Sequence, residues 1–570
     1  MTGGGLHRPL LLARGLNWLG DAVLSLPALR AARAGWDGDV LVLARGAGAG
    51  LYRLLGAGGE GPCPRPGPPA QGRLEVLEDL RGLGPKLRLV NSLRKRRIPE
   101  ALLWQHAFGA ALTAFLSGIP SRTGYARHGR RLLLTRAAVQ GPEELAAHEV
   151  FSHLRLVREA GLPAPFSLPR LPAPPAASPA GTAEGGGPPG LVPGQAGLRP
   201  GRAVSPPCRK AEALLPGLEA WLSGRRGFLL ALAPGASYGG AKRWPAASFA
   251  SAARLILEGR RGEAVILGGE GELEACLEAE RLLQGGPPCR NLAGKTDLAM
   301  CARILSEADL ALTNDSGLMH LACALGAPAV APFGPTDPAA TGPLGLRSAV
   351  LRSPVPCSPC LRRECPRKER ICFAGITPRL AAEAAERLLE APSRALPSTG
   401  RPGRPAVFAG GLPREAFLAS EDLPVIFALS PRAAADRRLE PPERARAWPF
   451  DPAFSRASRP FPGGKADAAP APGPAPQASF AGLPAYLVPE GSPQGFFRDL
   501  CLRLGVDPAR SFWLGPSLES LAPARALGGK AALWLGKGSG LPEDVLQGDW
   551  LPGVVAPGFQ QALDWAGAVR

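Results

Sequence analysis

The sequence predicts an α/β protein with two Rossmann-like domains followed by a third α/β unit, and three observations support this prediction. Apolar runs typical of strands alternate with amphipathic helix patterns from the N-terminus to about residue 162. The same alternation restarts at "GFLLALAP" and continues to about residue 395, and it appears again after the strand-like run "PAVFAGG". Such alternation is typical of a parallel sheet whose faces are covered by helices.

Two breaks in composition divide the chain. Residues 163–206 are rich in Pro, Gly and Ala and show no periodicity, so we expect a linker or surface insertion there. A second break, "PSRALPSTGRPGR", follows the helix pattern that ends near residue 395. We therefore predict domains at residues 1–162, 207–395 and 396–570, which agrees with a prior of about 150 residues per domain.

Composition restricts the class of protein. The chain has 570 residues and a formal net charge of +18, but aromatic residues make up only 6% and are scarce near the arginine clusters. This scarcity argues against a nucleic-acid-binding platform. No run reaches the ~18 apolar residues that span a bilayer, and the N-terminus lacks the apolar core and cleavage site of a signal peptide. We therefore expect a cytoplasmic protein.

The turn after the first predicted strand, within "RGLNWLGDAVLSLP", places Gly20 and Asp21 at the start of a helix. Open α/β sheets bind ligands at the carboxyl ends of their strands, so Asp21 is a candidate site residue. A capping role, in which Asp21 stabilises the N-terminus of its helix, explains the same pattern. The residues alone leave both interpretations open.

Three segments of the second domain combine small residues with polar or basic side chains after predicted strands: "APGASYGGAKRWP", "TNDSGLMHLA" and "FGPTDP". Glycine-rich turns let backbone amides approach phosphate oxygens, and a helix that begins directly after such a turn presents its N–H groups to an anion. An ordinary strand-to-helix turn with a capped helix is the alternative for each segment taken alone. The candidate ligand-binding residues are Ser237, Lys242, Asn314, Asp315, Ser316, Gly317, Met319, His320, Gly334 and Thr336.

The eleven cysteines of so long a chain do not form a disulfide framework, but four of them cluster. Cys357, Cys360, Cys365 and Cys372 form the pattern C-x2-C-x4-C-x6-C. Such spacing is suited to a structural zinc ion or an iron–sulfur cluster. Reduced thiols in a loop are the alternative, because neither half is the paired knuckle of a typical zinc site.

Taken together, these segments resemble the glycosyltransferase family 9 heptosyltransferases, and in particular their heptosyltransferase II branch. The resemblance extends from residue 8 to about residue 392, apart from the Pro/Gly-rich insertion, and includes "GIPSRTGYA", "NLAGKTDL" and "CSPCLRRECP". It implies a GT-B fold in which the first domain holds the acceptor and the second holds the nucleotide sugar. The implied reaction moves heptose, with inversion, from ADP-L-glycero-β-D-manno-heptose to the inner-core heptose of lipopolysaccharide (Hep-Kdo₂-lipid A).

The resemblance also implies roles for the candidate residues. Asp21 matches the family's general base and Lys242 its phosphate-binding lysine, while Ser316, Gly317 and the helix N-terminus would stabilise the diphosphate without a cofactor. Asp315 would bind heptose or ribose hydroxyls. The acceptor is a lipid, and the arginine clusters at 94–97 and 122–136 lie in the acceptor domain, so we expect peripheral contact with the cytoplasmic face of the inner membrane.

The third domain resembles haloacid-dehalogenase-type (HAD-like) phosphatases at "PAVFAGGLPREA" and over residues 505–535. Those phosphatases use a nucleophilic Asp, a second Asp two residues later and an acidic Mg²⁺ ligand. The aligned positions here are Gly410, Leu412 and Pro516, which cannot supply these functions. We therefore predict a degenerate domain without phosphatase activity.

Two other functions are compatible with the sequence. The decay of the third domain fits a non-catalytic scaffold or regulator that binds a nucleotide sugar, and a functional third domain would make the chain a bifunctional transferase and phosphatase. Retention of Asp21, Lys242 and the segment 314–320 favours the transferase.

Overall fold

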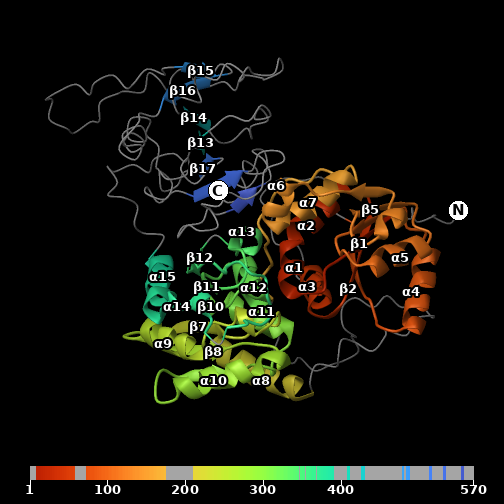
Figure 1. The fold of residues 1–570 in the computed structure, drawn as a ribbon. Coiled ribbons are helices and arrows are strands. Elements are labelled where there is room, and N and C mark those ends of the chain that lie inside the picture. The colour runs from red at the N-terminus through yellow and green to blue at the C-terminus, as the bar shows by residue number, and fades with distance from the viewer. Residues whose placement is uncertain are drawn as a thin grey trace, which may run out of the picture.

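The computed structural model describes residues 8–57, 72–174 and 209–390, apart from positions 346, 354 and 368, and the backbone of seven strands between residues 407 and 556. Figure 1 shows the first two domains side by side, each with a sheet flanked by helices. Helix α1 of the first domain faces helix α12 of the second. The first two domains confirm the predicted architecture of two Rossmann-like α/β units.

The first domain contains a parallel six-stranded sheet in the order β3-β2-β1-β4-β5-β6. The strands are β1 (Leu10–Arg14), β2 (Asp39–Ala44), β3 (Leu74–Glu78), β4 (Glu100–Leu103), β5 (Ser121–Tyr125) and β6 (Arg136–Ala138). The helices are α1 (Leu19–Leu24), α2 (Leu26–Gly35), α3 (Gly46–Ala57), α4 (Leu83–Lys95), α5 (Phe108–Leu116), the 3₁₀ turn η1 (Arg130–Leu133), α6 (Pro142–Ala146) and α7 (Glu149–Glu159). The order reverses between β1 and β4, which is where doubly wound sheets bind ligands.

The second domain repeats this topology with the sheet order β12-β11-β10-β7-β8-β9. The strands are β7 (Phe228–Ala233), β8 (Gly262–Ile266), β9 (Cys289–Asn291), β10 (Leu310–Thr313), β11 (Ala329–Phe333) and β12 (Ser348–Arg352). The helices are α8 (Arg209–Gly224), η2 (Gly240–Lys242), α9 (Ala246–Leu257), η3 (Glu270–Glu272), α10 (Leu273–Leu283), α11 (Leu298–Ser306), α12 (Gly317–Leu325), α13 (Pro338–Thr341), α14 (Ile371–Ala374) and α15 (Pro378–Glu390). Its order reverses between β7 and β10, so the loops after these strands lie at the second switch point.

Two patterns that predicted single helices each form two. The first pattern breaks at Ser25, because Pro27 in the first turn of α2 lacks the N–H that a continuous helix needs. The pattern at 143–162 breaks before His148, whose Nδ1 accepts a hydrogen bond from the Val150 amide at 3.3 Å and so caps α7. The second break places His148 against the second domain, where its Nε2 contacts the Gly342 carbonyl at 3.0 Å.

A shared apolar core holds the two domains together. One cluster of buried side chains includes Leu24 and Leu26 of the first domain and Leu305 and Leu321 of the second. Burial of apolar area on this scale is the main favourable term in folding. Within the described residues, no helix is both long and apolar enough to cross a membrane.

The segment predicted as a linker is packed over its first part. Residues 163–174 are described, and Phe166 and Leu168 are buried in the shared core. The Leu171 amide donates a hydrogen bond to the Ala324 carbonyl at the end of α12, at 2.8 Å. Its apolar residues, which a composition rich in Pro and Ala conceals, attach this segment to both domains. The rest of the predicted linker lies outside the described residues.

The third region forms a seven-stranded sheet in the order β15-β16-β14-β13-β17-β18-β19. The strands are β13 (Val407–Gly410), β14 (Val425–Leu429), β15 (Ala478–Phe480), β16 (Leu483–Leu487), β17 (Phe512–Gly515), β18 (Lys530–Trp534) and β19 (Val554–Ala556). All pairings are parallel except that of β15 with β16. Gly410 ends β13, whereas Leu412 and Pro516 lie outside the described residues. The phosphatase resemblance therefore stays a prediction.

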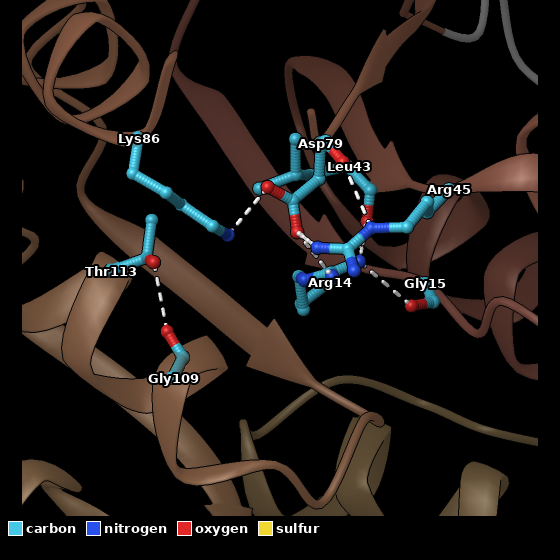
Figure 2. A network of polar contacts seen from close by, with 8 residues as sticks. All are labelled: Arg14, Gly15, Leu43, Arg45, Asp79, Lys86, Gly109 and Thr113. Atoms are coloured by element: carbon cyan, nitrogen blue, oxygen red, sulfur yellow. Dashed lines mark hydrogen bonds and ion pairs between the residues drawn. The ribbon is translucent and has the colours of Figure 1, made fainter. Parts of the chain in front are cut away.

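A buried carboxylate, Asp79, connects the carboxyl ends of the first three strands (Figure 2). Its Oδ2 accepts hydrogen bonds from Arg14 and Arg45, each at 2.8 Å, and its Oδ1 accepts one from Lys86. Arg14 is also buried and donates to the Leu43 carbonyl at 2.6 Å. Burial alone would raise the pKa of Asp79, but the hydrogen bond from Lys86 and the charges of the three cations outweigh it and hold that pKa below its usual value.

Replacing Asp79 should therefore destabilise the first domain. We expect Asp79→Asn to lower the free energy of unfolding by about 3 kcal/mol, because it leaves the buried Arg14 without its counter-ion. Since the folded-state pKa is depressed, this contribution is present above the unfolded-state pKa of about 4 and is lost as the pH falls through the folded-state value.

Urea unfolding followed by tryptophan fluorescence at neutral and acidic pH measures both effects. Glu78→Gln is the matched control, since it removes only the partly exposed ion pair with Arg53. It should cost less than about 1 kcal/mol. Equal costs for the two variants would contradict the role given to Asp79.

Candidate functional site

Two helix N-termini, one from each domain, meet at the domain interface. A Cβ added to Gly20 in α1 would lie 2.9 Å from the Cδ2 atom of His320 in α12. A Cβ on Gly317, at the start of α12, would lie 2.7 Å from the Cβ of Leu19. Glycine at both positions thus allows the two helix starts to approach closely. Their N-terminal dipoles make the junction favourable for a negatively charged group.

Asp21 lies in the first turn of α1, beside this junction. The residue at the capping position is Trp18, whose side chain makes no capping bond, so Asp21 is not the capping residue. Burial raises the pKa of Asp21; the charge of Lys242 lowers it and the charge of Asp315 raises it. Asp21 of the first domain is therefore within electrostatic reach of two charged groups of the second.

Lys242 and Asp315 form a buried ion pair in the second domain. The Lys242 Nζ lies 2.6 Å from the Asp315 Oδ2, and the hydroxyl of Thr336 donates to the same oxygen at 2.6 Å. The Lys242 Nζ also lies 4.8 Å from the centroid of the Tyr238 ring, a cation–π contact. Three of the predicted segments thus meet at one carboxylate, and they bring a cation beside the start of α12.

Ser316 and His320, at the start of α12, each carry a polar atom that lacks a partner among the described residues. Ser316 is the N-cap of α12, but its hydroxyl makes no capping bond. Its Oγ and the Nδ1 of His320 are both buried and have no hydrogen-bond partner among the described residues. Burial lowers the pKa of His320 to about 4, so its imidazole is neutral at pH 7. Both atoms are available to a polar ligand.

The side chains of two other predicted residues contact the protein scaffold. The Asn314 Oδ1 accepts a hydrogen bond from the Trp244 amide at 2.9 Å, and its Nδ2 donates to the Pro234 carbonyl at 2.7 Å. Asn314 therefore fixes the loops after β7 and η2. Met319 is fully buried beside Ala331 and Phe333. Its side chain therefore faces the sheet, and the assignment of this residue to the donor site stays a prediction.

Ser237 lies beside a buried carboxylate that the sequence analysis missed. Its hydroxyl donates to the Glu272 Oε1 at 3.0 Å, and the Gly269 amide donates to the Oε2 at 2.8 Å. Glu272 is only 8% exposed and follows the carboxyl end of β8. Its signal in the sequence was an acidic residue after the strand and Gly-Gly turn "VILGGEGE".

The segment that contains the clustered cysteines, residues 357–372, is called the Cys-rich segment. It forms hydrogen bonds with the loop that carries Lys242. The Tyr238 hydroxyl donates to the Leu361 carbonyl at 2.7 Å, the Ala241 amide donates to the Arg363 carbonyl at 2.9 Å, and the Gly240 amide donates to Glu364 Oε1 at 2.9 Å. The Arg370 Nη1 in turn donates to the Gly240 carbonyl at 2.9 Å. These contacts hold the backbone at the start of η2 and before it, and so position the loop that carries Lys242.

The same segment fastens the loop after β11. The Ser358 hydroxyl donates to the Gly334 carbonyl at 2.6 Å, and the Cys360 amide donates to the Pro335 carbonyl at 3.0 Å. A Cβ on Gly334 would lie 2.6 Å from Phe373, so packing explains this glycine. Gly334 is therefore a structural position next to the site.

The four clustered cysteines are free thiols. Burial, followed by the charges of the other three cysteines, raises the pKa of Cys372 to about 11. Across the described part of the chain, no group of three or more His, Cys, Asp or Glu side chains is arranged to hold a metal ion. The described geometry therefore gives the predicted zinc or iron–sulfur site no support.

The start of α7 adds a further acidic group that the sequence analysis missed. Burial and the charge of Asp21 raise the pKa of Glu149 to about 7. His148, one residue earlier, contacts the Gly342 carbonyl through Nε2 at 3.0 Å and so joins α7 to the second domain. In the sequence, "AHEVFSH" lies inside a helical pattern. Its polar residues are therefore expected on the solvent-exposed face of a helix.

Comparisons with known proteins show which family this chain resembles. A family model described as glycosyltransferase family 9 (heptosyltransferase) matches residues 208–371. The chain is 30% identical over 355 residues to lipopolysaccharide heptosyltransferase 2 of Salmonella typhimurium, covering 60% of this chain and 87% of that relative. It is 29% identical over 356 residues to lipopolysaccharide heptosyltransferase 2 of Escherichia coli K12, with the same coverage. The solved structure of E. coli ADP-heptose lipopolysaccharide heptosyltransferase II aligns with a TM-score of 0.47 and 23% identity, over 67% of this chain and 98% of that one.

The close approach of the two helix starts predicts the effect of adding a methyl group there. Gly317→Ala should destabilise the protein by about 1–3 kcal/mol, because the new Cβ must displace Leu19 across the interface. Thermal unfolding measures the change. Gly271→Ala is the control, since a Cβ at that position meets no atom within 4 Å. A Gly317→Ala protein as stable as the control would contradict the packing described.

Proposed function

Because the chain belongs to glycosyltransferase family 9, the heptosyltransferases, we propose that this glycosyltransferase moves heptose from ADP-L-glycero-β-D-manno-heptose to the inner-core heptose of Hep-Kdo₂-lipid A with inversion. One observation carries the proposal. Asp21 of the first domain lies within electrostatic reach of Lys242 and Asp315 of the second, beside the N-terminus of α12. The junction thus combines a base with a site for a diphosphate.

In this proposal the donor diphosphate lies at the N-terminus of α12. Lys242 exchanges its contact with Asp315 for the phosphate oxygens, and the Ser316 hydroxyl, which lacks a partner in the described residues, donates to the same group. The helix N-terminus and Lys242 stabilise the negative charge that develops on ADP as it leaves. The reaction as proposed uses no cofactor.

Asp21 acts as the general base. Its carboxylate accepts the proton of the acceptor hydroxyl while the oxygen attacks the anomeric carbon on the face opposite to ADP, which inverts that carbon. The raised pKa of Asp21 brings it closer to neutral pH than an ordinary carboxyl group and so makes it a stronger base. The positive charge of Lys242 lowers the pKa of Asp21 and so favours its ionised form.

Neighbouring groups supply contacts to hydroxyls. Asp315, once released by Lys242, and Thr336 face the donor from the ends of β10 and β11. Ser237 and Glu272 form a second polar pair after β7 and β8. We assign the first pair to the sugar and the second to the ribose. The neutral His320 imidazole can accept or donate one hydrogen bond beside Gly20.

The acceptor places the enzyme at the cytoplasmic face of the inner membrane, where a lipid-anchored substrate is within reach. The third domain is proposed to be a degenerate HAD-like unit with a structural or partner-binding role. Gly410 at the end of β13, the strand beside the switch point of its sheet, supports this, since glycine has no carboxylate to act as nucleophile.

Replacing the base should abolish transfer and spare donor binding. Incubation of the pure protein with ADP-heptose and Hep-Kdo₂-lipid A should add one heptose to the acceptor, detected by mass spectrometry. We expect Asp21→Asn to slow this transfer by about 10²–10⁴-fold, while calorimetry still detects donor binding. Asp37→Asn, at an exposed position of the same domain, is the control. An undiminished rate would remove Asp21 as the base.

Replacing the lysine should act mainly on the donor. Lys242→Met should raise the KM for ADP-heptose by about tenfold or more, because it removes a charge-assisted contact to the diphosphate. Lys242→Arg should recover part of the loss. Arg379→Met, at a strongly exposed position of the second domain, serves as the control for removal of a cation. A Lys242→Met enzyme with the wild-type KM for the donor would contradict the assignment.

A further inference from the structure

An exposed face of the first domain combines apolar side chains with a strong excess of positive charge. We propose that this face docks on an anionic phospholipid bilayer through partial insertion of its apolar side chains. We call it the docking face. It is formed by α4, α5 and η1, and its exposed apolar members are Leu83, Leu87, Phe108, Phe115, Leu116 and Leu132.

The apolar members are unusually exposed for large side chains. Leu83 is 78% exposed and Leu87, one helical turn later on α4, is 55% exposed. Leu132 in η1 is 91% exposed, and Phe108 at the start of α5 is 46% exposed. Single exposed apolar residues need no explanation, but several on adjacent elements mark an interaction site.

Two hydrogen bonds and a cation–π contact connect the three elements. Arg94 of α4 donates to the Leu116 carbonyl at the end of α5, at 2.6 Å. The guanidinium of Arg122 lies 5.3 Å from the centroid of the Phe115 ring of α5, and its Nε donates to the Leu133 carbonyl of η1 at 2.6 Å. Figure 1 shows α4 and α5 on the flank of the first domain that faces away from the second.

The charge of this part of the chain selects the partner. Between residues 80 and 139 the only acidic residue is Glu100, which is 7% exposed and pairs with Arg136. The exposed basic residues in the same interval are Arg81, Arg88, Arg94, Lys95, Arg97, Arg131 and Arg136. A surface that carries exposed apolar side chains and an excess of exposed cations matches a bilayer whose surface is anionic and whose interior is apolar.

The position of the docking face suits a membrane-anchored acceptor. Leu83, Phe108 and Leu132 follow the carboxyl ends of β3, β4 and β5, as Asp21 follows that of β1. Phe115 and Leu116 end α5 toward the opposite edge, so the docking face runs along the flank of the domain and reaches the carboxyl edge at these three residues. This step rests on the proposed function, in which the acceptor is a lipid, and it names the surface that approaches that lipid.

Vesicle sedimentation with the full-length chain tests the proposal. Wild-type protein should sediment with vesicles of phosphatidylglycerol and phosphatidylethanolamine, but not with phosphatidylcholine vesicles, and about 1 M salt should weaken binding, since the Debye length falls to about 3 Å. Leu83→Glu/Leu87→Glu should bind the anionic vesicles at least about tenfold more weakly, because it places charges where apolar contact is needed. Thermal unfolding and ADP binding should stay at wild-type values.

The chain offers a matched control on the second domain. Leu273 and Leu277 of α10 are also one turn apart, and Leu277 is as exposed as Leu87, at 55%. Leu273→Glu/Leu277→Glu should bind vesicles like the wild type. The proposal would be overturned if both double variants lost vesicle binding equally, or if the wild type bound neutral vesicles as well as anionic ones. It would also be overturned if RNA carrying an equal charge displaced the vesicles. The sedimentation assay contains no donor or acceptor. A failure to bind vesicles would therefore leave the proposed heptose transfer unaffected, and a failure to transfer heptose would leave the vesicle test valid.

Discussion

Helices α1 and α12 meet so closely at their first turns that a side chain at Gly20 or Gly317 would collide with the opposite domain. This contact fixes the relative position of the two sheets at their switch points. It places Asp21, which follows the first sheet, within electrostatic reach of Lys242 and Asp315, which follow strands of the second. A shared apolar core that includes Leu24 and Leu321 supports the same geometry. The remaining features of the site depend on this junction.

In the proposed function, Lys242 exchanges its contact with Asp315 for a contact with the donor diphosphate. Lys242 pairs with Asp315, and the buried hydroxyl of Ser316 has no partner among the described residues. A diphosphate would attract Lys242 away from Asp315 and free that carboxylate for hydroxyl groups. The Cys-rich segment stabilises this arrangement by bonding to the backbone of residues 240 and 241 on one side and 335 on the other. The cysteines thus lie in a structural brace of the site.

Periodicity predicted both Rossmann-like sheets, because buried parallel strands and amphipathic helices leave strong patterns. The polar turns after strands also indicated which segments gather. Spacing alone could not show that Met319 faces the sheet or that the Asn314 side chain is hydrogen-bonded to backbone groups. Neighbouring residues at the start of a helix point in different directions. Glu149 and Glu272 were missed for the opposite reason. In a sequence, a carboxylate at the start of a helical pattern resembles a solvated one, and only the folded structure shows the burial of Glu272 and the proximity of Glu149 to Asp21.

The account's central claim is that the donor diphosphate binds at the N-terminus of α12 facing Asp21. A crystal structure with an unreactive ADP-sugar analogue tests it most directly. We predict phosphate oxygens within hydrogen-bond distance of Lys242 Nζ and Ser316 Oγ, with the anomeric carbon between them and the carboxylate of Asp21. A diphosphate bound elsewhere, with Lys242 still paired to Asp315, would contradict the account.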